Sequence, residues 1–397
     1  MDAKTALSPT ITSEEEVDTT LLDGVAMCLS GGGYRAMLFH VGTLWRLNEL
    51  GWLKRLNRVS SVSGGSITAG VLGLAWTNLD FGPNGVARRF VDLVVNPVRK
   101  LAGISIDVKS ILTGILLPFI SISERVEAAY REHLFEAKTL QDLPSDSEGP
   151  RFVFNATNVQ TGALFRFSKP FFADYRLGLV RNPAVPLAKV VTASSAFPPV
   201  LSPMKLSLRG LQFEAGTGQA GYEDFRAEAV LTDGGVYDNM GLETAWKRYK
   251  TVLISDAGAK MPPELSPRTD WVRHGVRVLD IIDNQVRSLR KRIAIDAFRT
   301  GLRGGTYFGI TSDVAQYPAA GAFAAPHERT LELARIATRL SAMPEDAQKL
   351  LINWGYVICD AAMRSHVTPQ AVRPQALPYP DSPLSTLHSE GIGSKLG

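Results

Sequence analysis

Residues 25–47 read VAMCLSGGGYRAMLFHVGTLWRL. The segment opens with an apolar run rich in strand formers, which leads directly into the three glycines at 31–33. Apolar residues then recur at helical spacing over residues 34–50, and Gly51 can end the helix in a left-handed conformation. The segment therefore predicts a strand, a glycine turn and a helix.

The same arrangement follows again in the next part of the chain. RVSSV at 58–62 is a predicted strand, Ser63-Gly64-Gly65 is a turn, and the apolar run at 66–76 is a predicted helix. Alternating strands and helices favour a parallel sheet with helices on both faces, and ligands bind such sheets at the loops after the strands. The sequence thus predicts an α/β protein whose glycine turns lie at a ligand-binding edge.

The rest of the chain continues this pattern up to a proline-rich end. Further predicted strands lie at 152–157, 163–168, 227–232 and 251–255, and further helices at about 270–299 and 327–364. We expect an acidic flexible leader at 1–24, one domain with insertions and C-terminal helices at 25–365, and an unstructured proline-rich tail at 366–397.

Composition excludes several classes of protein. With 397 residues and a net charge of +4, the chain can bury a large core, and its charge argues neither for nucleic acid nor for an anionic membrane. Cys28 and Cys359 show no disulfide or metal-ligand pattern, so we expect a reducing compartment. The polar N-terminus lacks a secretory signal, and the longest apolar run, 111–122, is too short to span a bilayer. We expect a cytoplasmic protein with no transmembrane helix.

Chemistry is expected at the second glycine turn. Ser63 lies between a predicted strand and a predicted helix, with Gly65 two residues on, as in a nucleophile elbow that exposes a serine hydroxyl above a sheet. The match is partial, because Ser61 stands where an elbow usually has a glycine. Ser61 itself has no glycine two residues later and is the weaker candidate. Each glycine turn could also be only a structural feature of the fold.

An acyl-transfer serine needs donors for the oxyanion and a base for its proton. Backbone N–H groups of a glycine turn before a helix can be the donors. Glycine has no side chain to keep a substrate away from the backbone, and the N-terminus of a helix has a partial positive charge. The candidate donors are Gly32 and Gly33, together with Gly31 and Gly64. The candidate base is Asp233, which precedes Gly234-Gly235, and Asp256 follows another predicted strand as a second candidate. No histidine is expected near these turns.

Taken together and in this order, these segments resemble the patatin-like phospholipase family over about residues 25–260. They are SGGGYRAM at 30–37, SVSGG at 61–65, ASSAFPPV at 193–200 and TDGG at 232–235. The first is closer to the cytosolic phospholipase A2 group than to patatins. Departures from the usual patatin residues, which leave the subfamily open, are Ser30, Ala36 and Ser61.

The resemblance implies a three-layer α/β/α sandwich with a mostly parallel central sheet. It implies a lipid acyl hydrolase, of the phospholipase A or lysophospholipase type, that cleaves carboxylic esters of phospholipids through a Ser63–Asp233 dyad and a glycine-rich oxyanion hole, without a metal or other cofactor. ASSAFPPV is expected to border the active site. Loop-support roles are expected for Arg35, Gly65, Gly234 and Gly235.

Three alternatives to this reading stay open. An esterase with a Ser-His-Asp triad could use His274, His327 or His366. A catalytically inactive lipid-binding protein could keep the same fold. A dinucleotide-binding protein is suggested by Gly31-x-Gly33-x-x-Ala36, but that fingerprint also requires an acidic residue after the second strand, which here ends in Ser-Gly-Gly.

Two segments are candidates for contact with a membrane. The apolar run at 111–122 could be a lid or a membrane-contacting segment, or simply a buried core helix. The stretch at 286–303 is rich in basic residues, all of which lie at 287–303. These side chains could attract anionic head groups, or they could form an ordinary solvated helix face. We expect a phospholipid or other acyl-ester lipid as substrate and no nucleic acid as partner.

Overall fold

A computed structural model describes residues 20–106, 122–198, 201–259 and 261–386. Its strands are β1 Leu22–Leu29, β2 Leu56–Ser61, β3 Arg151–Asn158, β4 Ala163–Phe167, β5 Phe171–Asp174, β6 Gly178–Arg181, β7 Met204–Ser207, β8 Glu228–Asp233, β9 Tyr249–Asp256 and β10 Gly304–Gly309. The described strands form one sheet, in which β10, β9, β1, β2 and β3 run parallel in that order. β4, β5 and β6 continue the sheet antiparallel beyond β3. β8 pairs antiparallel with the end of β3, and β7 pairs with β8.

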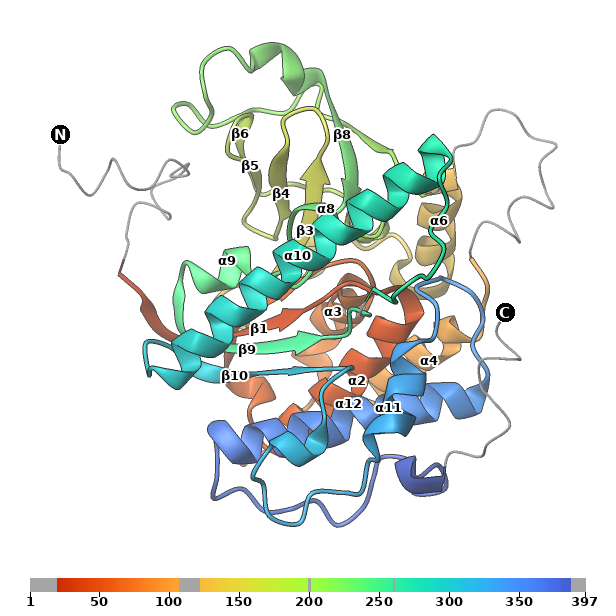
Figure 1. Ribbon diagram of the computed structural model, residues 1–397. Helices are drawn as coiled ribbons and strands as arrows, with labels where there is room; N and C mark the ends of the chain where they lie inside the picture. Colours follow the sequence, from red (N-terminus) through yellow and green to blue (C-terminus); the bar gives the residue numbers. More distant parts are fainter. Residues whose placement is uncertain (1–19, 107–121, 199–200, 260, 387–397) are drawn as a thin grey trace.

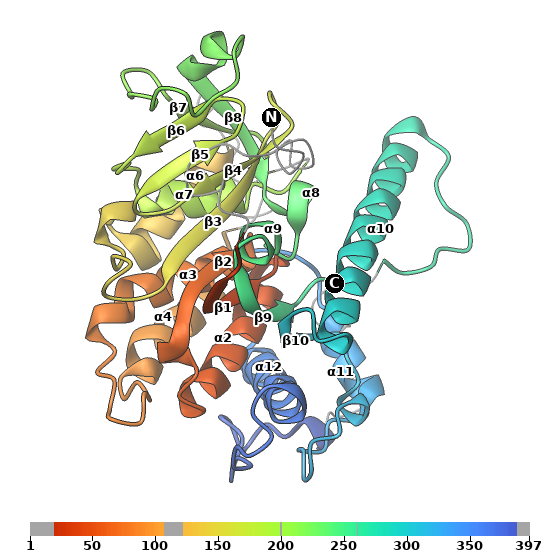
Figure 2. The same ribbon diagram turned by 90° about the vertical axis from the view of Figure 1, so that its left-hand side faces the viewer.

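Helices cover both faces of the parallel strands. They are α2 Gly33–Glu49, α3 Gly64–Ala75, α4 Asn96–Ala102, α6 Ile122–Tyr130, α7 Leu187–Ser194, α8 Gly235–Asp238, α9 Glu243–Trp246, α10 Trp271–Arg299, α11 His327–Ala334 and α12 Glu345–His366. α10 crosses in front of the sheet (Figure 1), and a quarter turn places α2, α3 and α4 on one side of the parallel strands and α10 on the other (Figure 2). The predicted α/β fold with helices flanking a largely parallel central sheet is confirmed.

The two largest apolar clusters of the described residues lie on opposite faces of the parallel strands. The larger core joins β1 and β2 to α2, α3 and α12, and the smaller one joins β1 and β9 to α9 and the last turns of α10. α2 and α12 pack backbone to backbone, because a Cβ on Gly42 would collide with the carbonyl of Ile352 and one on Gly355 with the carbonyl of Phe39. This close crossing buries α2 almost completely and holds the glycine turn at its N-terminus.

Several predicted boundaries change in the structure. β1 begins at Leu22, so the expected leader at 1–24 ends earlier; residues 1–19 lie outside the described residues. The helical pattern at 327–364 forms two helices, because residues 335–344 leave helical geometry before Pro344, which directly precedes α12.

The expected tail is irregular but is attached to the domain over residues 367–386. The amide of Asn353, buried on α12, donates to the carbonyls of Tyr379 (2.8 Å) and Ser382 (2.9 Å). Asn353 also accepts from the backbone N–H of Tyr379 at 3.0 Å. A buried amide needs such partners, so these bonds hold the segment against α12.

No helix in the described part of the chain is long and apolar enough to cross a membrane. The expected lid or membrane-contacting run at 111–122 lies outside the described residues except for Ile122, where α6 begins.

Candidate active site

Ser63 occupies a strained turn between β2 and α3. Its backbone has φ 52° and ψ −121°, a conformation that non-glycine residues rarely adopt and that clusters at functional sites. Its N–H donates to the hydroxyl oxygen of Ser194 at 3.1 Å, and its carbonyl accepts from the N–H of Ser66 at 2.8 Å, so the turn is held on both sides. Ser63 is mostly buried, but 7% of its surface is exposed to solvent. This is the backbone geometry expected of an elbow.

The glycines after Ser63 let the starts of α3 and α2 touch. A Cβ on Gly64 would collide with the carbonyl of Gly33, and a Cβ on Gly65 would lie 2.7 Å from the carbonyl oxygen of Ser30. The two glycine turns are therefore in direct backbone contact. The second turn lies at the β2–α3 junction and the first at the β1–α2 junction, on neighbouring parallel strands.

Asp233 is the last residue of β8, and only one of its two buried carboxylate oxygens accepts a hydrogen bond. Oδ1 accepts from the N–H of Gly235 at 2.7 Å, whereas Oδ2 is buried without a hydrogen-bond partner. Burial raises the pKa of this carboxyl to about 6; the Gly235 N–H and the hydroxyl of Ser63 oppose the rise, and the charge of Asp283 adds to it. The aspartate turn packs against the serine turn, because a Cβ on Gly234 would lie 3.2 Å from Cγ1 of Val62, the residue before Ser63. An ionisable group with an unpartnered oxygen next to a serine can act as its base.

Residues 194–196 join the serine turn to the aspartate turn. The hydroxyl of Ser194 accepts from Ser63, and its carbonyl accepts from the N–H of Gly234 at 3.2 Å. The N–H of Asp233 donates to the carbonyl of Ala196 at 2.9 Å. The Ala-Ser-Ser-Ala segment therefore sets the position of both candidate residues, in the place expected of a segment that borders the site.

A chain of buried hydroxyls continues behind the serine turn. Ser66 shares hydrogen bonds with Ser61 (2.9 Å) and Ser194 (2.8 Å), and Ser194 donates to the carbonyl of Asn155 at 2.6 Å. Ser61, at the position where an elbow usually has glycine, is fully buried and belongs to this chain. Its hydroxyl therefore stabilises the turn from within the core, and of the two serines only Ser63 is exposed to solvent.

Three backbone N–H groups near Ser63 are free to donate. Within the described residues, the amides of Gly32, Gly33 and Gly64 have no hydrogen-bond acceptor, while the N–H of Gly31 donates to the carbonyl of Asn239 at 3.0 Å. Gly32 and Gly33 have φ of 141° and 60°, which only glycine adopts readily. Gly31 lies against the nucleophile turn, because a Cβ there would be 3.2 Å from Cβ of Ser63.

Sequence reasoning missed Asn239, which follows α8. Besides accepting from Gly31 through its carbonyl, it places its side-chain Oδ1 against the first glycine turn and against the Gly234-Gly235 turn. A Cβ on Gly31 would collide with that oxygen, and a Cβ on Gly235 would lie 2.7 Å from it. Asn239 lies six residues after the predicted aspartate, but nothing in its sequence context marks it.

A histidine adjoins the first glycine turn, contrary to expectation. His40 lies two turns into α2, and its Nε2 is 2.9 Å from the carbonyl oxygen of Ser30 while its Nδ1 is 2.9 Å from the hydroxyl of Ser255. Burial lowers the pKa of His40 to about 4, so the ring is neutral at physiological pH. Its seven-residue spacing from Gly33 puts it on the same face of the helix, a signal that could have located it.

Arg35 and Asp256 hold the loop after β9. Arg35 is buried and donates to the carbonyl of Ala257 at 3.1 Å and to that of Ile336. Asp256, the second candidate base, accepts from the hydroxyl of Tyr307 at 2.8 Å and forms an ion pair with Arg287 at 3.5 Å. Burial alone would raise the pKa of Asp256, but Arg287 and the hydrogen bonds outweigh it and lower the pKa. Asp256 is thus fully engaged in structural contacts.

The alternative assignments find little support in this geometry. His274 is exposed on α10, His327 begins α11, and His366 ends α12 against the ring of Tyr317. None of these three histidines contacts Ser63 or Asp233 among the described interactions.

At the N-terminus of α2, where the dinucleotide fingerprint would hold a pyrophosphate, the backbone of Arg339 already uses one of the N–H groups. The N–H of Tyr34 donates to the carbonyl of Arg339 at 3.0 Å. A Cβ on Gly33 would lie 2.9 Å from the backbone nitrogen of Arg339. Within the described residues, no cluster of His, Cys, Asp and Glu could hold a metal ion.

The basic stretch at 287–303 is only partly a surface feature. Arg287 pairs with Asp256, and Arg290 pairs with Glu243 at 3.0 Å and Asp238 at 3.6 Å. The expected cationic cluster is therefore divided, because inward-facing arginines anchor α10 to the body. The guanidinium of Arg303 lies over the ring of Trp246 and the ammonium of Lys291 over that of Tyr307, whereas Arg292 and Arg299 are exposed.

The sequence profile of a family described as patatin-like phospholipase matches residues 27–246. No protein of the curated set matches the sequence.

Among solved structures, human GIVD cytosolic phospholipase A2 is similar, with a TM-score of 0.51 and 13% identity over 90% of this chain and 63% of that one. The same human enzyme bound to the inhibitor methyl gamma-linolenyl fluorophosphonate and terbium chloride gives 0.49, at 14% identity over 90% and 60%. VipD from Legionella pneumophila gives 0.36, at 17% identity over 87% and 67%. The first likeness shows a shared fold, and the present chain spans less than two thirds of the human chain.

Proposed function

Because the chain belongs to the patatin-like phospholipase family, we propose that it is a lipid acyl hydrolase that cleaves carboxylic esters of phospholipids through Ser63 and Asp233. The observation that carries this proposal is the buried, unpartnered Oδ2 of Asp233 beside the hydroxyl of a strained serine. A carboxylate of this kind can act as base without an intervening histidine.

In the first step, Ser63 Oγ attacks the ester carbonyl carbon while Asp233 accepts the hydroxyl proton. With a pKa of about 6, the carboxylate is ionised at neutral pH and still basic enough to take a proton in the transition state. The carbonyl oxygen becomes the oxyanion of a tetrahedral intermediate. The free amides of Gly32, Gly33 and Gly64 are the donors for this oxyanion.

In the second step, the intermediate collapses and the C–O bond to the leaving alcohol breaks. The protonated Asp233 returns its proton to the departing oxygen, which leaves an acyl ester on Ser63. A water molecule then attacks this ester with Asp233 as base, and the fatty acid leaves as Ser63 regains its proton. The hydroxyl of Ser194, which bonds the Ser63 N–H, keeps the elbow in place through both steps.

The proposal is tested by replacing the two reacting groups with near-isosteric ones. We expect Ser63→Ala and Asp233→Asn each to lower ester hydrolysis by at least about a thousandfold while the circular dichroism spectrum is unchanged. A fluorophosphonate probe should label Ser63 in the folded wild type, as shown by peptide mass spectrometry.

Matched controls separate the dyad from a triad. His274→Ala, His327→Ala and His366→Ala should each keep wild-type hydrolysis, since none of these side chains contacts the proposed dyad. Loss of hydrolysis in one of them would replace the dyad with a triad. Full hydrolysis by Ser63→Ala, or folded wild type that neither hydrolyses esters nor reacts with the probe, would refute the proposal.

A further inference from the structure

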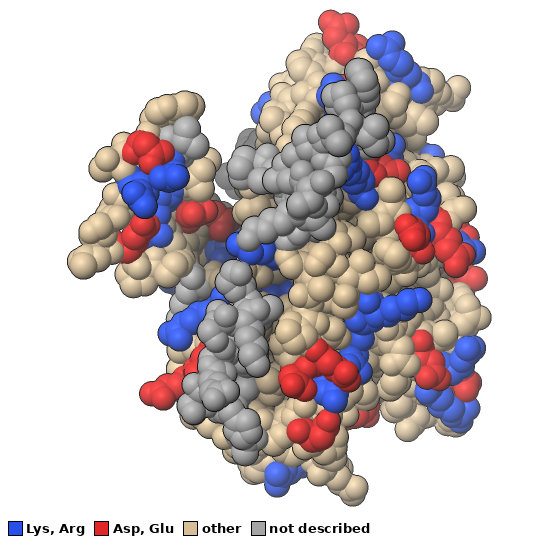
Figure 3. Space-filling view, turned by 90° about the vertical axis from the view of Figure 1, so that its right-hand side faces the viewer, with Lys and Arg blue, Asp and Glu red and all other residues tan. Residues whose placement is uncertain are grey.

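α10 is anchored over only part of its length. Towards its C-terminus, Ala294 and Ala297 are buried in the core, and Arg287 and Arg290 form the ion pairs described above. Residues 271–282 extend beyond these anchors, and in Figure 2 and Figure 3 this end of the helix stands apart from the body. None of the described side chains at 271–282 is buried.

This projecting part of α10 exposes large apolar side chains. Trp271 is 85% exposed, Leu279 65% and Ile282 54%. Three more exposed apolar residues accompany them: Val276, Val278 and Ile281. The same face continues along the anchored part of the helix with Val286, Leu289 and Ile293. A continuous apolar face of this extent on a helix normally marks a surface that binds something.

The width of the apolar face distinguishes a lipid surface from a second helix. At 3.6 residues per turn, the exposed apolar side chains at 271–282 cover well over half of the helix circumference. A seam for helix pairing is a narrow stripe of two positions in seven. A helix lying in a lipid interface instead immerses a broad apolar sector.

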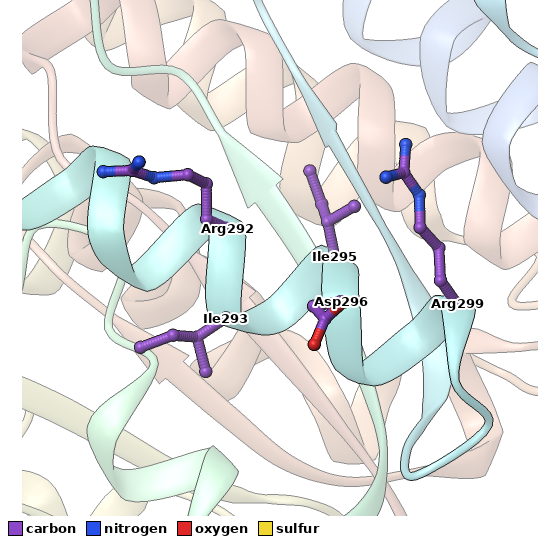
Figure 4. Close-up of a pocket in the computed structure, with 5 residues that line it drawn as sticks. All are labelled: Arg292, Ile293, Ile295, Asp296 and Arg299. Atoms are coloured by element: carbon purple, nitrogen blue, oxygen red, sulfur yellow. The ribbon is translucent and has the colours of Figure 1, made fainter.

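Charge on the neighbouring flank of α10 favours the same partner. Arg273 and Arg277 adjoin the apolar face on one side of the helix and are paired there with Asp270 at 3.8 Å and Glu264 at 3.7 Å, whereas Arg292 and Arg299, further along the same side, are exposed. Arg292 and Arg299 also line a surface hollow of about 560 Å³ with Ile293, Ile295 and Asp296 (Figure 4). Guanidinium groups beside an apolar sector match the phosphates and acyl chains of a lipid surface.

The projecting helix lies beside the candidate active site. The charge of Asp283, where the projection begins, contributes to the raised pKa of Asp233. One turn further on, Arg287 pairs with Asp256 at the end of β9 and packs against Gly258. Figure 1 shows the N-terminal end of α10 on the side towards which β1 and β9 point. Ser63 follows β2, which runs parallel to β1, so it lies at the same edge of the sheet.

From this placement we infer that residues 271–282 of α10 dock the protein on a lipid bilayer, with the apolar sector among the acyl chains and the exposed Arg292 and Arg299 of the same flank at the phosphates. The inference rests on the proposed function only in naming the bilayer as the source of the substrate. Docking through this helix brings the side of the sheet that carries Ser63 to the lipid surface.

The inference is tested on the full chain with Ser63→Ala, so that binding is measured without hydrolysis. The probe is a vesicle of phosphatidylcholine and phosphatidylglycerol, and binding is read by co-sedimentation. We expect Trp271→Ser, Leu279→Ser and Ile282→Ser combined to weaken vesicle binding by at least about tenfold, because three apolar side chains no longer enter the lipid. The matched control is Leu302→Ser with Val372→Ser, two exposed apolar residues outside the helix, and it should bind as the parent does.

Activity on a soluble short-chain ester separates this inference from the proposed function. With Ser63 restored, the triple variant should hydrolyse that ester at the wild-type rate and lose activity only on vesicles. A parent chain that does not bind vesicles, or a triple variant that binds them equally well, would overturn the inference. So would a parent that is a dimer by light scattering and a triple variant that is a monomer, because a second copy would then cover the helix.

Discussion

Asp233→Asn should stabilise the protein while abolishing hydrolysis. In the wild type, an ionised carboxylate is 2% exposed and has one oxygen without a hydrogen-bond partner, an arrangement that disfavours the folded state at neutral pH. Asparagine keeps an oxygen that can accept from the Gly235 N–H and has no charge to desolvate. Ser63 also gains an amide donor in place of its base.

The magnitude follows from the pKa of Asp233. Folding moves that pKa from the ordinary 3.8 to about 6, and each unit corresponds to about 1.4 kcal/mol, so ionisation costs the folded state about 3 kcal/mol at neutral pH. Because the folded-state pKa is the higher one, the folded protein binds the proton more tightly. The free energy of unfolding of the wild type should therefore decrease as pH rises from about 4 to about 6, and this contribution should be constant above that range.

The assay is urea unfolding of wild type and Asp233→Asn at several pH values, followed by circular dichroism. The variant should gain up to about 3 kcal/mol near neutral pH and little near pH 4, and the difference between the two curves isolates Asp233 from other titrating groups. An unchanged or lower stability of the variant at neutral pH would refute the reasoning, because the wild-type carboxylate would then be fully compensated in the folded state. In parallel, kcat/KM of the wild type should decrease with pH below about 6, since the base must be ionised.

Further substitutions test the surroundings of the site. Ser194→Ala removes the acceptor of the Ser63 N–H, and kcat should fall by about tenfold or more in steady-state assays with little change in KM. Gly64→Ala places a methyl group against the Gly33 carbonyl, so we expect loss of activity and a free energy of unfolding lowered by at least about 2 kcal/mol in urea titrations. His40→Phe leaves the two buried oxygens that His40 contacts without that partner, which should cost about 2–4 kcal/mol in the same assay.

Much of this molecule could be predicted from local patterns. Apolar periodicity and glycine placement located β1, β2, α2 and α3 to within a few residues, because strand, turn and helix are each specified by neighbours in sequence. Among the strands that pair only in antiparallel fashion, the sequence predicted β4 and β8, at 163–168 and 227–232. The strands β5, β6 and β7 have four residues each, too few for a periodicity to be detected, and β10, which begins with two glycines, was not predicted either.

The candidate residues were predicted by type, but their surroundings were not. Asn239 and His40 contact the glycine turn through groups that no motif marks, and Ser194 links two turns whose separation in the chain exceeds a hundred residues. The direction in which the arginines of α10 face was also hidden. Arg287 and Arg290 look like surface charges in the sequence, and only their pairing with Asp256, Asp238 and Glu243 shows that they anchor the helix.

The α/β class, the glycine turns after β1 and β2, and the serine and aspartate at strand ends follow from local sequence patterns, because they depend on backbone conformation and short-range spacing. Which side chains are buried, and which charges each of them faces, depends instead on contacts between residues far apart in the chain. Burial in a low-dielectric environment raises the pKa of Asp233 and leaves its Oδ2 unpartnered, while Asp256, equally buried, is neutralised by Arg287. Two aspartates that look alike in sequence thus differ because of the charges that the fold brings to them.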